Sequence, residues 1–279
     1  MLATCWTSAG NVRPGPFTRS SPLPLLERIE AVAEAGFRGF GLHSVDLDAA
    51  VGRYGLKGIR NLLETHGIED VELEAIPGWW SEDSESHSIR RRVLEAAEAL
   101  GARHIKVTPD EHGGTWDLSL WSRRFAALAA QAEDVGARLG IEFLPWSNIK
   151  DLAAGLRFVE EAGHTNGGVV LDIWHLERNN TPAAAILEVP LDRITGVELN
   201  DAAADVVGSL FDDTIDRRRY CGEGDFGLGD FIGALRTVGW SGPWGIEILS
   251  MEHRAAPVRA ALLEAGATAG VLLSKYSRT

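Results

Sequence analysis

The sequence predicts an α/β protein built as one closed (β/α)8 barrel, a TIM barrel. The chain has 279 residues, and such a barrel typically needs about 250. Amphipathic helical segments alternate with short β-rich runs along the whole chain, which is typical of a parallel sheet. There are eight such runs, and this number favours a closed barrel over an open, doubly wound sheet. We therefore expect a single domain over residues 1–279.

Most predicted strands follow a helical segment that ends near a glycine, as many helices do. In the first unit, Leu25, Ile29 and Val32 recur at helical spacing before Gly36, and a β-rich run comes next. The segment Asn200–Arg219 is long for a connection, so we expect it to form a lid over the barrel mouth. The expected strands are Leu2–Trp6, Phe37–His43, Val71–Ala75, Arg103–Thr108, Arg138–Phe143, Gly168–Asp172, Ile194–Leu199 and Trp244–Leu249.

Composition excludes several classes of protein. A formal charge of −13 disfavours nucleic-acid binding, which relies on clustered lysines and arginines. The stretches of apolar residues are shorter than the roughly 18 that a membrane helix needs, so no membrane partner is expected. Cys5 and Cys221 are too few for a disulfide framework, and the N-terminus does not resemble a signal peptide. We expect a cytoplasmic protein, and the sequence leaves open whether it forms a homo-oligomer.

Four acidic residues lie at or near the ends of predicted strands. In a barrel these strand ends meet at one mouth, where active sites lie. Ionised carboxylates at the ends of buried strands must be neutralised, and one shared divalent ion would do so. Because oxygen ligands suit Mn²⁺ or Mg²⁺ better than Zn²⁺, we expect one of the first two ions. The predicted metal ligands are Glu142, Asp172, Glu198 and Glu247.

Motifs around these acids resemble those of the xylose-isomerase-like sugar phosphate isomerase/epimerase superfamily, and the resemblance covers nearly the whole chain. In similar proteins a Glu, an Asp, a His or Gln and a final Glu hold one divalent metal, so Glu198 departs from the pattern. Its extra charge would favour a hard cation, or Glu198 would bond another group, such as a lid arginine. The motifs are Ile141-Glu142-Phe143, Leu171-Asp172-Ile-Trp-His175, Val197-Glu-Leu-Asn-Asp201, Arg219-Tyr-Cys-Gly-Glu-Gly-Asp-Phe226 and Gly242-Pro-Trp-Gly-Ile-Glu247.

The resemblance also implies catalytic roles for Glu142 and Glu247, which would flank a substrate and shuttle a proton between its carbons. Removing a proton next to a carbonyl needs a positioned base and a metal that holds the developing enediolate oxygens. Two bases on opposite faces would give epimerisation, and one base serving both carbons would give aldose–ketose isomerisation. The sequence does not separate these outcomes.

Further residues are expected to contact the substrate. The resemblance implies this role for His175, and for Arg219 with Arg217 or Arg218 as alternatives. His43 ends a predicted strand and would either bind substrate or cap the core. Tryptophans near the strand ends could stack on the C–H faces of a sugar and exclude water, although some must pack loops instead. These are Trp6, Trp116 and Trp174, with Trp79, Trp80 and Trp146 nearby, whereas Trp121 and Trp240 are expected in the core.

The leading functional hypothesis is therefore a metal-dependent isomerase or epimerase of a sugar, keto-sugar or related small polyhydroxy carbonyl compound. A dehydratase or other lyase acting on a keto-inositol or a dehydroshikimate-like compound is the first alternative, because it begins with the same proton abstraction. A non-catalytic scaffold of the same fold is the second alternative. An endonuclease of a related barrel type is disfavoured by the acidic charge and by the presence of only eight histidines.

Overall fold

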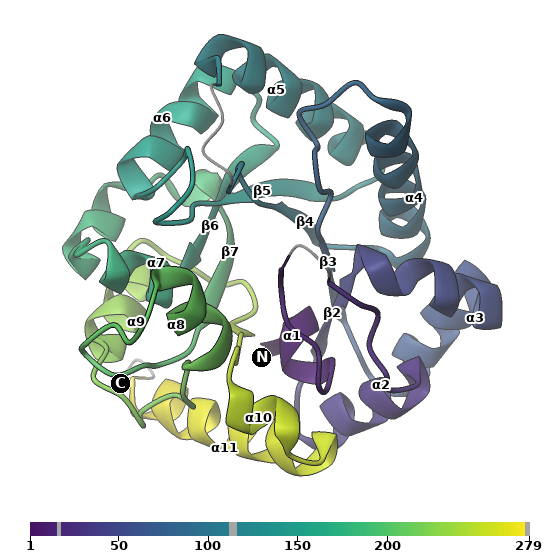
Figure 1. The fold of residues 1–279 in the computed structure, drawn as a ribbon, viewed down its shortest axis with the longest axis vertical. Coiled ribbons are helices and arrows are strands. Elements are labelled where there is room, and N and C mark those ends of the chain that lie inside the picture. The colour runs from purple at the N-terminus through teal and green to yellow at the C-terminus, as the bar shows by residue number, and fades with distance from the viewer. Residues whose placement is uncertain (16–17, 112–115, 277–279) are drawn as a thin grey trace.

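A computed structural model describes residues 1–15, 18–111 and 116–276 of the chain. Eight parallel strands form a closed barrel at the centre, and helices surround it (Figure 1). The single (β/α)8 barrel expected from the sequence is thus confirmed. The strands are β1 (Leu2–Ala3), β2 (Gly39–His43), β3 (Asp70–Glu74), β4 (His104–Val107), β5 (Arg138–Glu142), β6 (Gly167–Asp172), β7 (Ile194–Leu199) and β8 (Gly245–Ile246).

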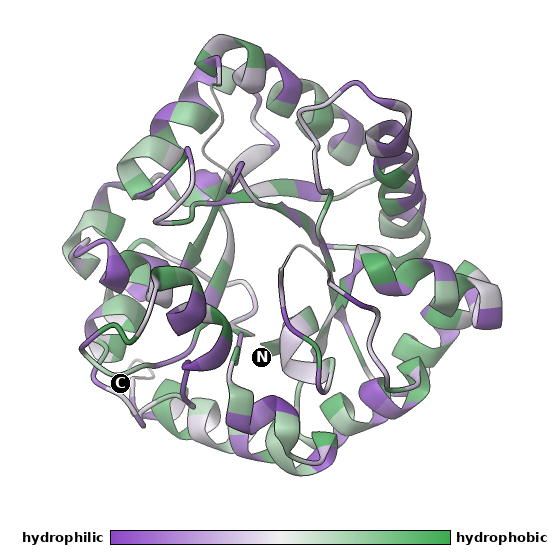
Figure 2. Cartoon of the chain, in the orientation of Figure 1, coloured by the Kyte–Doolittle hydropathy of each residue, from purple (hydrophilic) through white to green (hydrophobic). Residues whose placement is uncertain are grey.

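The outer helices are amphipathic, and Figure 2 shows hydrophobic and hydrophilic residues alternating along them. Their apolar faces pack on the strands and bury a large core, and a small second cluster is formed by Cys5, Trp6 and Leu249. The helices are α1 (Cys5–Ser8), α2 (Leu25–Glu34), α3 (Ser44–Thr65), α4 (Ser84–Leu100), α5 (Leu118–Asp134), α6 (Leu152–Ala162), α7 (Ile173–Arg178), α8 (Leu210–Asp216), α9 (Leu228–Thr237), α10 (Met251–Ala255) and α11 (Val258–Lys275), with 3₁₀ turns η1 (Ala183–Glu188) and η2 (Leu191–Arg193).

The first strand closes the barrel, because Leu2 pairs with Gly39 of β2 and with Gly245 of β8. This strand is shorter than expected, since the chain turns into α1 at Cys5. The turn passes very close to β2: a Cβ atom on Gly41 would lie 2.4 Å from the backbone nitrogen of Cys5. Trp6 therefore lies on a helix above the strand end instead of within a strand.

The carboxyl ends of the last four strands bring the predicted acids to one edge of the barrel. Asp172 of β6 is in register with Glu198 of β7, and Glu198 is in register with Gly245 of β8. A Cβ atom on Gly245 would approach the Glu198 side chain to 3.2 Å and the Val197 carbonyl oxygen to 2.6 Å. Glycine at this position therefore leaves room for the Glu198 side chain.

The predicted lid segment, Asn200–Arg219, contains helix α8. A capping box formed by Ser209 and Asp212 begins this helix. Leu210, Phe211 and Thr214 face the cavity at the barrel mouth, so the segment covers one side of it. In the part of the chain that the structure describes, the helices are too short or too polar to cross a membrane.

Candidate active site at the barrel mouth

The four predicted metal ligands come together at the mouth. Each is almost completely buried, and one carboxylate oxygen from each lies within 4.8 Å of the others. Burying several carboxylates so close together is unfavourable unless cations neutralise them. The set comprises Glu142 at the end of β5, Asp172 at the end of β6, Glu198 in β7 and Glu247 just after β8.

Lys106 supplies one of these cations, and the sequence reasoning missed it. Its side chain is fully buried in β4, and its Nζ atom donates hydrogen bonds to Glu198 Oε1 at 2.7 Å and to Glu247 Oε1 at 3.0 Å. The same nitrogen lies 3.1 Å from Glu74 Oε2 and 3.4 Å from Glu142 Oε2. Burial acts to lower the pKa of this lysine, but the surrounding glutamates outweigh it and raise the pKa well above its ordinary value. The signal that could have identified this residue is a charged lysine within the short apolar run that forms β4.

Arg218 supplies the second cation. Its Nη1 atom donates to Asp172 Oδ2 at 2.6 Å and to Glu247 Oε2 at 3.0 Å, while Thr214 accepts from its other nitrogens. Arg219, which was expected to contact the substrate, is exposed and donates to the Glu223 carbonyl oxygen. The backbone of Arg219 forms a bridge with Asp201, whereas the backbone nitrogen of Arg218 donates to the Leu249 carbonyl oxygen, so the two adjacent residues have different neighbours. The structure therefore replaces Arg219 by Arg218 as the arginine that faces the mouth, and no arginine pairs with Glu198 among the described residues.

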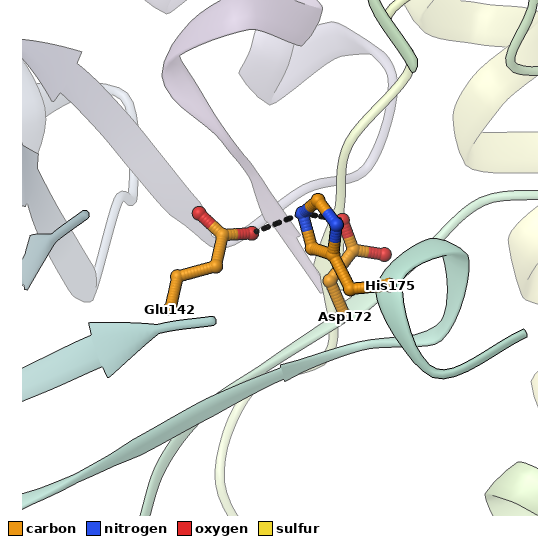
Figure 3. A group of neighbouring side chains, drawn as sticks. All are labelled: Glu142, Asp172 and His175. Atoms are coloured by element: carbon orange, nitrogen blue, oxygen red, sulfur yellow. Dashed lines mark ion pairs between the residues drawn. The ribbon is translucent and has the colours of Figure 1, made fainter. Parts of the chain in front are cut away.

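His175 lies beside the acids, as expected. It is on α7, which begins directly after β6 and is capped by the Asp172 side chain. Its Nε2 atom is 3.3 Å from Glu142 Oε1 and 3.6 Å from Asp172 Oδ2 (Figure 3). The ring also lines the cavity, so this histidine connects the carboxylate cluster with the space above it.

The acids differ in their affinity for protons because their neighbours differ. Burial alone would raise the pKa of Glu142, but the charge of Lys106 holds it well below its usual range. Burial, with Glu142 and Glu74 close by, raises the pKa of Glu247 to about 8 although Lys106 and Arg218 oppose the shift. Burial and the neighbouring Glu247 also raise the pKa of Glu198 well above its ordinary value. The raised pKa values of Glu198 and Glu247 indicate that Lys106 and Arg218 do not neutralise all of the carboxylates at this site.

The residues present fit a divalent cation. Oε1 of Glu142 and Oε2 of Glu198 are buried and accept no hydrogen bond within the described part of the chain, although Glu142 Oε1 lies 3.3 Å from His175 Nε2. Such orphaned oxygens are costly unless a positive charge meets them. The four carboxylates carry a charge of −4 when ionised, and Lys106, which also contacts Glu74, offsets at most half of it together with Arg218, so a divalent ion would meet the remaining charge.

A cavity of about 990 Å³ opens above the acids. Glu142 and Glu247 are part of its wall, whereas Asp172 and Glu198 do not line it. The mouth also has a wall formed by the first strands, where Trp6 packs against His43 with ring centroids 4.9 Å apart. Both of these predicted substrate contacts line the cavity.

The remaining tryptophans divide between the cavity and the core. Trp80 and Trp146 line the cavity, and Trp80 stacks on Trp121 at 4.3 Å. Trp116 and Trp174 do not line it, in contrast to the expectation from their positions in the sequence. Trp116 packs against Trp121 and Phe158, and Trp174 lies behind Arg218, whose Cζ is 5.6 Å from its ring centroid. Trp79, Trp121 and Trp240 are buried in the core.

Sequence comparison identifies relatives among curated proteins. The chain is 26% identical over 246 residues to a 3-dehydroshikimate dehydratase of Pseudomonas putida. This alignment covers 86% of this chain but 38% of that protein. The chain thus spans less than two fifths of that relative's length. It is 20% identical over 263 residues to an inosose isomerase of Halalkalibacterium halodurans, covering 90% of this chain and 92% of that protein.

Solved structures share the fold. A zinc-bound IolI protein superposes over 100% of both chains with a TM-score of 0.83 and 18% identity. An L-ribulose 3-epimerase covers 99% of this chain and 95% of its own, with a TM-score of 0.74 and 18% identity. The family described as xylose isomerase-like TIM barrel matches residues 29–265. With the closed barrel and the acids gathered at its mouth, this match means that the chain belongs to the xylose isomerase-like TIM-barrel family.

Proposed function

We propose that the protein is a divalent-metal-dependent isomerase or epimerase of a small polyhydroxy carbonyl compound. One observation carries the proposal: of the four clustered carboxylates, Glu142 and Glu247 line the cavity, while Asp172 and Glu198 do not. The two residues that line the cavity are thus within reach of a substrate, and the other two complete a cation site. A passive binding surface would not need buried charges of this kind.

Glu142 and Glu247 would transfer the proton. Environments that push the pKa values of two carboxyl groups apart suit them to opposite roles. The low pKa of Glu142 keeps it ionised and able to accept a proton from carbon, whereas the pKa of Glu247, about 8, allows it to carry one in the cation-free protein. A divalent ion held by the four acids would stabilise negative charge that develops on substrate oxygen. Oxygen ligands favour Mn²⁺ or Mg²⁺ for this role.

His175 would orient the substrate, and Arg218 would hold Glu247 in place beside it. Both line the cavity next to the acids, and Nδ1 of His175 has no hydrogen-bond partner among the described residues. A buried ring nitrogen of this kind is available to a substrate hydroxyl or carbonyl oxygen. Trp6 and His43 would close the opposite wall and exclude water.

The charges of the cavity wall favour an uncharged substrate. Arg218 is the one lysine or arginine among the described residues that line the cavity, and its nitrogens already bond Asp172, Glu247 and Thr214. The wall also carries several acids, among them Glu74 and Glu111. A phosphate or carboxylate would therefore lack a free cationic partner and would meet like charge. Neutral keto-polyols and ketoses fit these walls better.

A dehydratase is the second candidate, because the relatives of that name have the higher identity, 26% and 27%. It would use the same base for proton removal and would then expel water β to the carbonyl. A dehydroshikimate-like substrate carries a carboxylate, which the charges of the cavity wall disfavour. For this reason we place the isomerase or epimerase first.

Solvent exchange tests the proposal directly. The protein would be incubated in D₂O with Mn²⁺ and a panel of ketoses, keto-inositols and keto-acids, and the substrates followed by NMR. We expect deuterium on the carbon next to the carbonyl of a neutral compound, and chelation should abolish the label. Label that appears together with water loss would favour the dehydratase. A scaffold would give no label with any compound, and that result would overturn the proposal.

A further inference from the structure

Lys106 has no part in the function proposed above, although it lies at the centre of the acidic cluster. Its nitrogen is surrounded by four glutamates, at 2.7–3.4 Å. A fully buried lysine is rare unless it is paired. The question is therefore which carboxylate it neutralises.

Three of the four glutamates have other partners. Glu247 also accepts from Arg218 at 3.0 Å, and Glu142 has His175 at 3.3 Å. Glu74 accepts from Cys5 Sγ at 3.2 Å and from Trp6 Nε1 at 3.1 Å. These contacts spread the charge of each group over neighbours other than the lysine.

Glu198 differs from the other three. Lys106 is its one hydrogen-bonding partner among the described residues, at the shortest distance of the four, and its second oxygen accepts no hydrogen bond. Glu198 is 1% exposed, so solvent does not screen its charge. Of the carboxylates around Lys106, it is the one that depends most on this lysine.

We infer that Lys106 and Glu198 form a fixed ion pair that acts as one neutral unit and sets the charge of the cation site. Lys106 is the counter-charge of Glu198 and a positioning residue, because it faces the acids and not the cavity. A bound divalent ion displaces protons from the carboxylates that hold it. With Glu198 then ionised and paired with Lys106, Glu142, Asp172 and Glu247 together with Arg218 carry a charge of −2, which matches one divalent ion. The inference rests on the proposed function, since it assigns a role within the same site.

If the two residues form such a pair, replacing either one should change the affinity for Mn²⁺ in opposite directions. Lys106→Met leaves an extra negative charge beside the ion, so the affinity for Mn²⁺ should rise by at least about tenfold. Glu198→Gln leaves an uncompensated ammonium group beside the ion, so the affinity should fall by at least about tenfold. The double variant restores the charge, and its affinity should lie within about threefold of the wild type.

The test is a calorimetric titration of the metal-stripped full chain with Mn²⁺ at one fixed pH. Lys57→Met on α3 and Glu161→Gln on α6 make the same chemical changes at exposed positions and should leave the affinity unchanged. Two single variants that shift the affinity in the same direction, or a double variant that combines two losses, would overturn the inference. If the wild type binds no Mn²⁺, the proposed metal dependence fails.

Thermal unfolding in excess chelator tests the ion pair without any metal. Lys106→Met removes the counter-charge of Glu198, which must then either take up a proton or stay charged without a partner in a buried position, and we expect the melting temperature to fall by about 5–15 °C. The double variant should recover most of the lost melting temperature. If Lys106→Met alone fails to fold, the double variant should still fold. A double variant no more stable than Lys106→Met would show that Lys106 does not serve Glu198, whatever the metal titration gives.

Discussion

The two sides of the barrel mouth both contain a buried glutamate at a strand end, yet the surroundings differ. On the side of β5 to β8, Glu142 lies among three further acids, and charged groups surround it. On the side of β1 to β3, Glu74 ends its strand in an equivalent position and also contacts Lys106, at 3.1 Å, but neutral donors bond both of its oxygens, Cys5 on one and Trp6 on the other. The first arrangement leaves excess negative charge for a cation and a substrate. The second ties the carboxylate to helix α1.

This difference teaches that a carboxylate at a strand end does not by itself define a reactive group. What distinguishes the two sides is the number of charges that share one small volume. The side of β5 to β8 should therefore carry the chemistry, and the side of β1 to β3 should fix the shape of the mouth.

The largest expected effect comes from replacing Glu142 by glutamine, with the same replacement of Glu74 on the other side of the mouth as the comparison. Glu142→Gln removes the proposed base, and solvent deuterium exchange on a substrate should fall by about 10²–10⁴-fold while the protein stays folded. Glu74→Gln keeps the size of the side chain and should retain at least about a tenth of the exchange rate. The measurement is NMR of deuterium incorporation with Mn²⁺ present.

Circular dichroism of both variants provides the control for folding. If Glu74→Gln lost as much exchange as Glu142→Gln, the two sides would share the chemistry and the distinction between them would disappear. Full turnover in Glu142→Gln would remove Glu142 from the mechanism.

The next largest effect concerns two neighbouring arginines. Arg218→Met leaves Asp172 and Glu247 buried with fewer cations, and breaking such a buried pair typically costs about 3–5 kcal/mol. Arg219→Met changes an exposed side chain and should alter the free energy of unfolding by less than about 0.5 kcal/mol. Urea denaturation of the two variants in chelator measures both values. Equal stability of the two variants would contradict the role of Arg218 as a counter-charge.

The neighbouring arginines also show which features of the site can be predicted from the sequence and which cannot. Alternation of helix and strand predicted the barrel, and the acids at four successive strand ends were found to lie within 4.8 Å of one another. The resemblance pointed to Arg219, yet the side chain that faces the mouth belongs to the preceding residue. Which of two adjacent side chains points inward depends on the exact register of an irregular segment, and periodicity does not fix that register.

Lys106 was missed for a different reason. Within His104-Ile-Lys106-Val it looked like part of an ordinary strand, and its role depends on glutamates from four other strand ends. Trp116 and Trp174 were assigned to the substrate because they follow strands, but packing against Phe158 and Arg218 turned them away from the cavity. Contacts between residues that are distant in the sequence decided all three cases.

The third prediction concerns the pH dependence of stability in the metal-free protein. Because the folded-state pKa of Glu247 is raised to about 8, its contribution to stability is fully present below its ordinary pKa and is lost as pH rises through 8. Between about pH 6 and pH 9 this loss amounts to roughly 2–3 kcal/mol. Glu142 has a lowered pKa, so its contribution is lost only at acidic pH.

Thermal melts in chelator across this range would measure the loss, and melts with Mn²⁺ would show whether the ion removes it. A divalent ion takes the place of the proton, so the alkaline decline should largely vanish when Mn²⁺ is added. Glu247→Gln cannot ionise and should show a shallower decline even in chelator. An identical slope in this variant would assign the decline to other groups.

The smallest expected effect belongs to the shape-forming side. Trp6→Phe removes the indole donor to Glu74 Oε1, which lies 3.1 Å away, but keeps an aromatic ring against His43. Since Cys5 and Lys106 still contact the carboxylate, the loss in stability should be about 1–2 kcal/mol. With a ring still closing this wall, substrate should bind more weakly while the metal-dependent exchange rate at saturation stays within about threefold of the wild type. A large fall in the saturated rate would mean that the tryptophan takes part in the chemistry, and the two sides of the mouth would then not be separable.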